Sequence, residues 1–209
     1  MDLLVDEEYT EQKLRRVEWN DHTLTKLDIG SYYSEHAIFK YCRPDWSRLG
    51  SAITKNTNLV ELEVILNENV AIEVTDENLL NGLKQNKSIQ KLILDFSRRS
   101  IVGTIIHVIS RAYQENSNLT DIIIKYARWQ TRDDYRIITN TLIPNTNLRN
   151  IKLIYSGITD EELLPMIEAI RGHRILEDLT LYGNSIGNMG CQALATLLAD
   201  TNCNLNVLN

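Results

Sequence analysis

The sequence predicts an α/β solenoid in which short parallel strands line a concave face and helices cover a convex face. Three observations lead to this prediction: an apolar phrase recurs along the chain, its copies are almost evenly spaced, and a helical pattern follows most of them. The chain has 209 residues, of which 43% are hydrophobic and 24% are charged, as in folded globular proteins. The expected core is therefore a column rather than a sphere.

The recurring phrase is L-x-x-L-x-L, with Ile or Val also accepted at the apolar positions. Its copies begin at Leu24, Leu59, Ile89, Leu119, Leu148, Leu176 and Leu205, so the intervals are 35, 30, 30, 29, 28 and 29 residues. Three residues before the phrase, five copies carry an asparagine: Asn56, Asn86, Asn116, Asn145 and Asn202. We expect this asparagine at helix ends, in the left-handed conformation and hydrogen-bonded to nearby backbone.

Each copy of the phrase predicts one strand followed by one helix. The end of the phrase alternates apolar and polar residues, as a half-buried strand does. The clearest helix covers residues 159–170, where apolar residues recur at i, i+3, i+4 and i+7, and Thr159 with Glu162 forms a capping box. Pro165 is expected to bend this helix. Further helical patterns lie in residues 75–83, 105–112, 137–142 and 193–198.

Side-by-side stacking of these units predicts the curvature. About 29 residues per unit are enough for the crossover that parallel strands require. Strands pack roughly 4.8 Å apart and helices about 10 Å apart, so the strands must lie on the inner side of a curved array.

The unit Leu176-x-x-Leu179-x-Leu181-x-x-Asn184-x-Ile186-x-x-x-Gly190-Cys191-x-Ala193-Leu194 resembles the leucine-rich repeats of the ribonuclease-inhibitor subfamily. This subfamily includes the repeats of NOD-like receptors, Ran GTPase-activating proteins and tropomodulin-type proteins. The resemblance covers residues 21–209 and implies a leucine-rich repeat solenoid (horseshoe). It also implies a buried Cys191 at a helix start, and a turn-bonding asparagine at the strand end, matched here by Asn184 and Asn67.

The expected organisation is an N-terminal cap at residues 1–20 and a repeat array at 21–209. The array holds six repeats of 28–30 residues, the first of them longer, and a truncated seventh. Because the sequence stops inside a copy of the phrase, we expect a fragment of a longer protein or a shortened gene product. A dimer paired through the open strand edge is the alternative to a monomer.

Composition and motifs exclude several classes of function. A net charge of −6 without a basic run argues against nucleic acid as the partner. The sequence has no signal peptide and no apolar run long enough to cross a membrane, and three scattered cysteines indicate a reducing, cytoplasmic location. Motifs for zinc, acyl transfer or nucleotide binding are missing, so we expect no enzyme, no cofactor and no metal.

The candidate binding residues lie on or just beyond the strands that face the concave side. They are Ile65, Leu66, Ile93, Phe96, Ile123, Tyr126, Lys152, Tyr155 and Tyr182. Two interpretations stay open: these residues form an exposed interface, or they pack into the turns of their own repeats. Charges of alternating sign follow the same face, either as a solvated surface or as groups that steer a partner.

The function expected from these residues and from the resemblance is non-enzymatic binding of a protein partner on the concave strand face. The alternative is a GTPase-activating scaffold, or an immune-sensor fragment of a larger protein.

Overall fold

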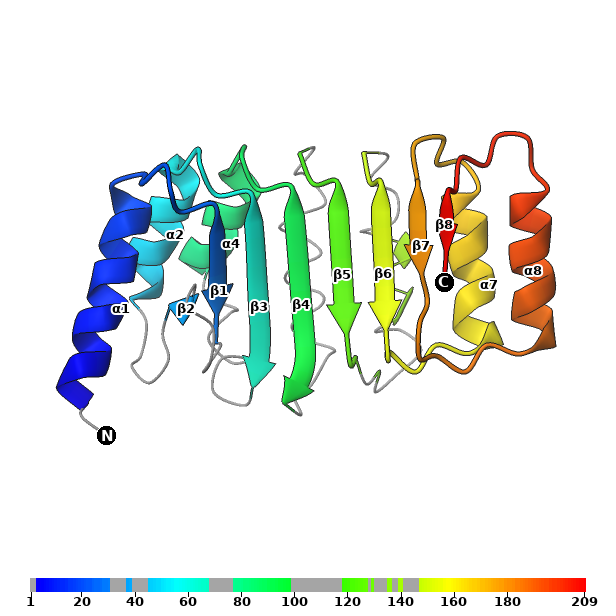
Figure 1. Cartoon of the computed structure of the whole chain (residues 1–209), viewed down its shortest axis with the longest axis horizontal. Coiled ribbons are helices and arrows are strands. Elements are labelled where there is room, and N and C mark those ends of the chain that lie inside the picture. Colours follow the sequence, from blue (N-terminus) through cyan, green and yellow to red (C-terminus); the bar gives the residue numbers. More distant parts are fainter. Residues whose placement is uncertain are drawn as a thin grey trace.

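The computed structural model describes residues 3–30, 37–38, 45–67, 77–98, 118–127, 129, 135–136, 139–140 and 147–209. The strands in these ranges are β1 (Lys26–Ile29), β2 (Ala37–Ile38), β3 (Glu61–Asn67), β4 (Lys91–Arg98), β5 (Asp121–Lys125), β6 (Asn150–Ile154), β7 (Asp178–Thr180) and β8 (Val207–Leu208). Within the described part of the chain they form one eight-stranded parallel sheet, in the order β2-β1-β3-β4-β5-β6-β7-β8 (Figure 1). Apart from β2, the strands lie in the sheet in the same order as in the sequence, as the even spacing of the phrase predicts.

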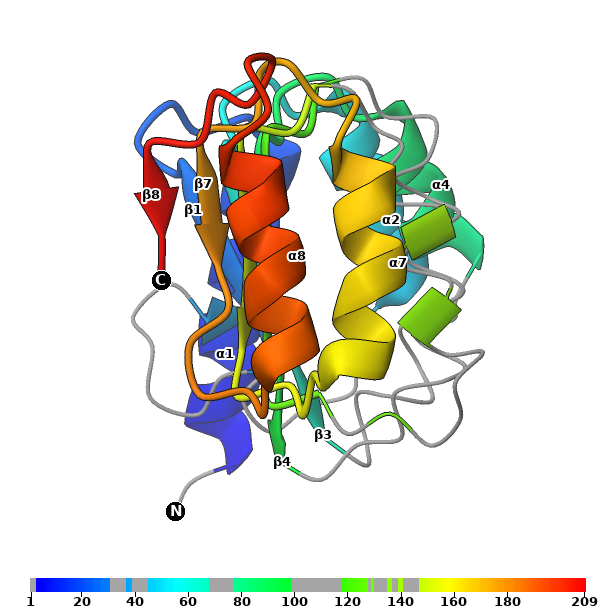
Figure 2. The ribbon, with the colours of Figure 1, turned by 90° about the vertical axis from the view of Figure 1, so that its right-hand side faces the viewer.

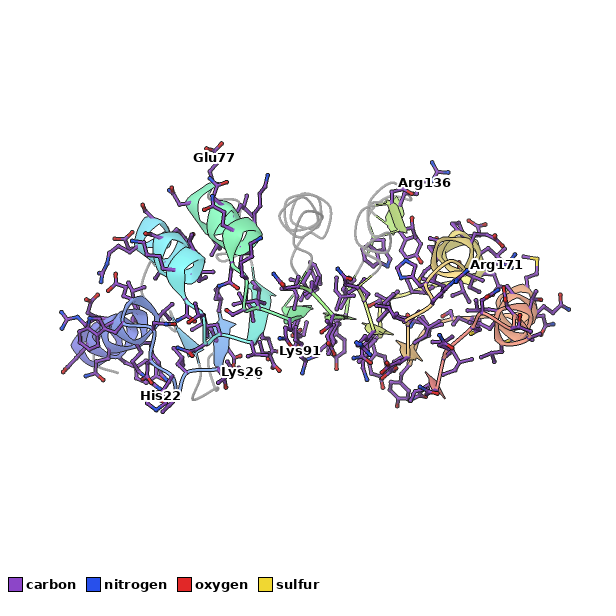
Figure 3. The ribbon with its side chains drawn as sticks, turned by 90° about the horizontal axis from the view of Figure 1, so that it is seen from above. His22, Lys26, Glu77, Lys91, Arg136 and Arg171 are labelled. Carbon is purple, nitrogen blue, oxygen red and sulfur yellow. The ribbon has the colours of Figure 1, made fainter. Side chains whose placement is uncertain are left out.

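The helices with described bounds are α1 (Leu3–Glu18), α2 (Trp46–Lys55), α4 (Glu77–Gln85), α7 (Asp160–Ile170) and α8 (Asn188–Leu198). Seen from above, the molecule is a shallow arc with the strands inside and the helices outside (Figure 3). Lys26 and Lys91 lie on the strand side, whereas Glu77 and Arg136 lie on the helical side and point outward (Figure 3). Viewed along the array from its C-terminal end, α7 and α8 lie to one side of β7 and β8 (Figure 2). The predicted α/β leucine-rich repeat solenoid is therefore confirmed.

The core lies between the two layers and is built from the apolar positions of the phrase. The second apolar residue of each of the first six phrases is buried and stands in register with its neighbours in the sheet: Leu27, Leu62, Leu92, Ile122, Ile151 and Leu179. Leu208, its counterpart in the seventh phrase, is 38% exposed. Burial of each such side chain contributes about 1.5–3 kcal/mol to folding. At one end α1 packs against α2 and adds Leu14 and Val17 to this core.

The recurrent asparagine joins successive repeats. The buried side chain of Asn86 donates to the carbonyls of Ile53 and Asn56 at 2.7 and 2.9 Å, and accepts from the amides of Ser88 and Ile89 at 2.8 and 2.7 Å. The asparagine one repeat earlier, Asn56, donates to the carbonyl of Val17 and accepts from the amides of Asn58 and Leu59. It has an extended backbone with φ −73°, so the expected left-handed conformation was wrong at this position. The side chain, and not a special backbone angle, makes asparagine suitable there.

Two glycines let neighbouring helices approach closely. A Cβ on Gly50 of α2 would lie 2.2 Å from the carbonyl oxygen of Asn78, and one on Gly82 of α4 would lie 2.4 Å from the oxygen of Gly50. Both distances are far below van der Waals contact, so neither position accepts a larger side chain without a shift of the helices.

The helix ends show how sequence signals act locally. Thr159 and Glu162 form the predicted capping box, and α7 continues as an α-helix through Pro165. The first turn of α8 has no side-chain cap of its own; instead, the amide of Gly187 donates to the Asp160 carboxylate at 2.7 Å.

The predicted burial of Cys191 is wrong, because its side chain is exposed. The residue before it, Gly190, faces Asp160 and Leu163 of α7, and the next position on the helix therefore points away from that contact. The helix expected at 105–112, most of the helix expected at 137–142, Asn116 and Asn145 lie outside the described residues.

Candidate protein-binding surface

The polar positions of the strands form an ion-pair network on the inner face. Lys26, Glu61 and Lys91 stand side by side at the start of β1, β3 and β4. Lys26 lies 3.1 Å from the Glu61 carboxylate, and Lys91 lies 2.8 Å from it. The alternating charges of the sequence are therefore paired across strands on this part of the face.

The next polar position extends the network over several repeats. The Glu63 carboxylate lies 3.2 Å from Lys26 and 3.2 Å from Lys125, although Lys125 belongs to a strand two places away in the sheet. Lys152 pairs with Asp178 at 2.5 Å. These partners are half-buried, so their attraction is screened less than that of fully exposed pairs.

Opposing effects act on the charged groups of this network. Burial by itself would lower the pKa of Lys26, but hydrogen bonds to Glu61 and Glu63 and the charge of Asp28 raise it above its ordinary value. Burial by itself would raise the pKa of Glu61, but hydrogen bonds from Lys91 and Lys26 outweigh it and hold that pKa below its ordinary value. Both groups are therefore charged at neutral pH.

Beyond the ends of β5, β6 and β7, three exposed tyrosines form what we call the tyrosine row: Tyr126, Tyr155 and Tyr182. Their exposed fractions are 42%, 46% and 53%. The rings of Tyr126 and Tyr155 are stacked, with centroids 5.5 Å apart and planes 2° apart. Tyr155 meets Tyr182 edge-on, with centroids 5.2 Å apart and planes at 80°. The rings thus make a continuous aromatic surface across three repeats.

The backbone beneath the tyrosine row is unusual. Tyr126 and Tyr155 have φ of 57° and 49°, in the left-handed region that costs a residue with a Cβ roughly 1–2 kcal/mol. Sheet register makes them equivalent to Gly183, which has φ 72°. The turn therefore requires a left-handed backbone at this position. Two of the three repeats have a tyrosine there, although glycine adopts this conformation more readily.

Backbone hydrogen bonds and a close ring contact fix the tyrosine row. The amide of Tyr126 donates to the carbonyl of Ile154 at 2.9 Å, and the amide of Tyr155 donates to that of Tyr182 at 2.9 Å. A Cβ on Gly183 would lie 2.3 Å from the Tyr155 ring, so this glycine makes room for the ring. The side-chain hydrogen bond with Tyr182 raises the pKa of the Tyr155 phenol above its ordinary value.

The turn that follows the tyrosine row has its backbone groups hydrogen-bonded by an asparagine side chain, as the repeat pattern predicts. The half-buried Asn184 side chain donates to the carbonyls of Leu153 and Leu181 at 2.7 and 2.6 Å, and it accepts from the amides of Ser156 and Ile158. One repeat earlier, Ser156 stands in place of this asparagine, and its hydroxyl donates to the carbonyl of Ile154 at 3.1 Å.

The structure divides the nine predicted binding residues. Tyr126, Tyr155 and Tyr182 come together in the tyrosine row. Ile65, Ile123 and Lys152 are half-buried on the inner face, and Lys152 is held by its ion pair. The side chain of Leu66 lies outside the described residues.

The prediction of an exposed binding residue is wrong for Ile93 and Phe96, because these side chains are only 5% and 3% exposed. Phe96 belongs to the hydrophobic core. Phe96 is buried because the two neighbouring strands end at different positions. Strand β5 ends at Lys125, but β4 stays extended through Arg98. Alternation along β4 turns Phe96 inward, whereas the left-handed turn leaves the equivalent Tyr126 exposed.

Gly183 was missed as part of this surface by reasoning from the sequence. An alignment of the repeats on their strand register places Gly183 beside Tyr126 and Tyr155, and that alignment is the signal that could have found it.

In the described ranges, no group of three or more His, Cys, Asp or Glu residues is arranged to hold a metal ion. Across those same ranges, no helix has the length and apolar character needed to span a bilayer.

Comparison with known proteins finds a relative that matches only part of this chain. No protein-family model matches the sequence. Ribonuclease inhibitor from Sus scrofa is 34% identical to this chain over 67 residues, which cover 32% of this chain and only 15% of that protein. Among solved structures, actin-binding site 2 of leiomodin-1 has a TM-score of 0.45 at 19% identity, covering 90% of this chain and 86% of that one. The C-terminal domain of Caenorhabditis elegans tropomodulin has a TM-score of 0.45 at 11% identity, covering 90% of both chains.

The assignment of the fold rests on features of the chain itself, and the ribonuclease inhibitor match agrees with it. Each described repeat contributes one strand to an all-parallel sheet, the helices lie on the outer side, and Asn184 bonds the turn as the repeat pattern requires. The chain therefore has the fold of a leucine-rich repeat solenoid, and a stretch of 67 residues within it is similar to ribonuclease inhibitor.

Proposed function

We propose that this chain is a non-enzymatic module that binds a protein partner on its inner strand face, with the tyrosine row as the main contact. The observation that carries the proposal is the strained backbone of Tyr126 and Tyr155. Strain of this kind persists where it serves a function, because a glycine at the same position, as at Gly183, would relieve it.

The exposure of the rings supports the same conclusion. Aromatic residues supply a large share of the energy in protein interfaces, since they bury much area at a low cost in conformational entropy. Tyr182 is more than half exposed, and its ring and that of Tyr126 flank Tyr155. A partner that covers the row would bury three adjacent rings at once.

The ribonuclease inhibitor match favours binding over catalysis, because the name of that relative describes a protein that acts on another protein. The match covers a small part of the relative, so it does not identify the partner of this chain. Within the described residues, nothing favours the GTPase-activating or immune-sensor alternative over simple partner binding.

Affinity capture with matched variants tests the proposal. Tyr126→Asn/Tyr155→Asn removes two rings and keeps a residue that accepts the left-handed backbone. Trp19→Ser is the control, because Trp19 is an exposed aromatic residue in a different part of the molecule. We expect the double variant to lose a partner that the wild type and the control retain, with all three proteins melting at similar temperatures. Retention of the partner by the folded double variant would refute the proposal.

A further inference from the structure

We infer that the C-terminal end of the array binds a second copy of this chain, so that two copies form a closed two-fold dimer. The surface concerned consists of β8 and one side of α8, which belong to the end of the array that faces the viewer in Figure 2. It is separate from the inner strand face, so the inference goes beyond the proposed function and does not rest on it. Its supports are an apolar stripe on α8, the charges of residues 179–209 and the backbone groups of β8.

The apolar stripe of α8 repeats the core positions of α7. In α7 these positions are buried: Leu163, Met166, Ile167 and Ile170. Helix α8 begins 28 residues after α7, as its phrase does, and the same positions there hold Cys191, Leu194, Ala195 and Leu198. Gly190 of α8 packs against Leu163, so the neighbouring helix helps to cover the stripe of α7. Ile170 is only 2% exposed, whereas its counterpart Leu198 is 48% exposed.

Three of these α8 residues are exposed, and we call them the end stripe: Cys191, Ala195 and Leu198. Its spacing is that of a helix face that packs against another helix. The end stripe is therefore built like a buried contact between two helices, but it lies on the surface.

The charges of this part of the chain favour a second copy as the occupant. Of the 22 Lys+Arg and 28 Asp+Glu residues of the chain, only Asp200 lies within residues 179–209. In a two-fold interface each surface meets a copy of itself, so a charged patch would face charges of its own sign. An uncharged patch avoids that repulsion, and it offers a charged partner no group to pair with.

The backbone of β8 can also pair with a copy of itself. The Val207 amide donates toward β7, to the carbonyl of Glu177 at 3.0 Å. The Asn209 amide donates in the same direction, to the carbonyl of Leu179 at 3.3 Å. Alternation along the strand then directs the amide and carbonyl of Leu208 to the opposite side, and β8 is the last strand of the described sheet. Two antiparallel strands with Leu208 on the two-fold axis would exchange both hydrogen bonds.

This strand pairing brings the two end stripes together. A two-fold axis perpendicular to the sheet keeps the helices of both copies on the same side. Helix α8 then lies beside α8 of the second copy, as neighbouring helices do within the array, and each end stripe covers the other. The sheet continues from one copy into the next, so the inner strand faces of both copies stay open on the same side.

The opposite end of the array does not suit head-to-tail growth. There α1 packs against α2 and β2, and eight of its 16 residues are charged. A head-to-tail contact would press the uncharged end stripe against this helix and take charges out of water without partners. An interface between two C-terminal ends uses the uncharged surface of both copies, so association stops at two.

Sedimentation velocity of the full chain over a range of concentrations tests the inference. We expect the wild type, with a chain mass of 24.1 kDa, to reach the mass of two chains as the concentration rises. Leu198→Lys places a charge in the end stripe and should weaken the dimer roughly tenfold or more. A lysine near a helix C-terminus suits the helix dipole, so the fold should be kept. The control is Leu164→Lys, because Leu164 is exposed on α7 outside the end stripe, and this variant should dimerise like the wild type.

Two further variants test the strand pairing. Leu208→Pro removes the outward amide but none of the bonds to β7, so it should weaken the dimer without lowering the melting temperature. With Leu208 on the axis, Val207 stands opposite Asn209 of the second copy, with Cα atoms about 4.5 Å apart. That distance suits a disulfide, so Val207→Cys/Asn209→Cys should oxidise to a covalent dimer. Val207→Cys alone, and the wild type with its own cysteines, should not.

Four results would overturn the inference. The wild type could stay a monomer at every concentration, or grow into assemblies larger than two chains. Leu198→Lys could dimerise as tightly as the wild type, or the double cysteine variant could form no covalent dimer. Circular dichroism checks that each variant is folded, and the cross-linking result stands even if Leu198→Lys unfolds. Each of these failures leaves the proposed function untouched, because Tyr126 and Tyr155 lie outside the end surface.

Discussion

Tyr155 combines a strained backbone with an exposed ring, and its substitutions separate the two features. Tyr155→Gly removes the ring but relieves the left-handed strain, so we expect the free energy of unfolding to stay within about 1 kcal/mol of the wild type. Tyr155→Val also removes the ring but places a β-branched residue at φ 49°, and we expect it to cost about 2 kcal/mol more than the glycine variant. Urea denaturation measures both. Equal stabilities of the two variants would mean that the turn does not demand this conformation.

Asn86 shows how one side chain can hold two repeats together. Asn86→Ala leaves the carbonyls of Ile53 and Asn56 and the amides of Ser88 and Ile89 without this partner in a buried site. Each unsatisfied buried group costs about 1–3 kcal/mol, so we expect a loss of at least 2 kcal/mol in the free energy of unfolding.

Asn202 provides the matched control for Asn86, because it occupies the same position of the repeat but is exposed. Asn202→Ala should change stability by no more than about 0.5 kcal/mol. If both alanine variants lost the same amount, the buried hydrogen bonds of Asn86 could not be the cause.

At the scale of elements, the sequence predicted strand positions well but not strand ends. The apolar phrase placed Leu62, Leu92 and Ile122 in register, because alternation follows from burial of one face. Whether the chain stays extended past that point depends on the neighbouring turn. The same position of the repeat therefore holds a buried Phe96 and an exposed Tyr126, and hydrophobicity alone could not separate them.

The helix layer was predicted by pattern, but its tightest contact was not. The pattern at residues 75–83 predicted a helix even though it contains Gly82, and glycine is a poor helix former. In the structure, α2 and α4 meet at Gly50 and Gly82, where a side chain has no room. A contact between two helices is a tertiary feature, so no local pattern in either helix reveals it.

Gly50→Ala tests this helix contact. The added methyl group would lie 2.2 Å from the carbonyl oxygen of Asn78, so α2 and α4 must move apart. Overpacking of this kind costs roughly 1–3 kcal/mol, which a thermal melt detects as a lower midpoint. Gly172→Ala is the control, because a Cβ there meets nothing within 4 Å, and its midpoint should stay close to that of the wild type.

At the scale of the whole molecule, the ion-pair network joins repeats that do not touch through their strands. Each repeat of a solenoid otherwise contacts only its neighbours. Glu63 on β3 bonds both Lys26 on β1 and Lys125 on β5, and this contact with Lys125 spans 62 residues of sequence. Removal of the Glu63 carboxylate should therefore weaken contacts in several repeats together.

The pH dependence of stability follows from the direction of the pKa shift at Glu61. Hydrogen bonds from Lys91 and Lys26 outweigh burial and hold this pKa below its ordinary value of 4.5 in the folded protein. A carboxylate with a lowered pKa stabilises the fold fully above its unfolded pKa, and that stabilisation is lost as pH falls through the folded value. We therefore expect Glu61→Gln to be less stable than the wild type at neutral pH, and the difference to narrow at about pH 3.

Urea denaturation at both pH values measures this effect, with Glu168→Gln as the control. Glu168 is an exposed carboxylate that pairs with Arg171 on the same stretch of chain, at 3.2 Å. Exposed pairs of this kind contribute at most about 1 kcal/mol, so this control should differ little from the wild type at either pH. A gap between Glu61→Gln and the wild type that is the same at both pH values would show that the network does not couple protonation to folding. The charges of the inner face would then act as a solvated surface, which is the other interpretation of the alternating charges in the sequence.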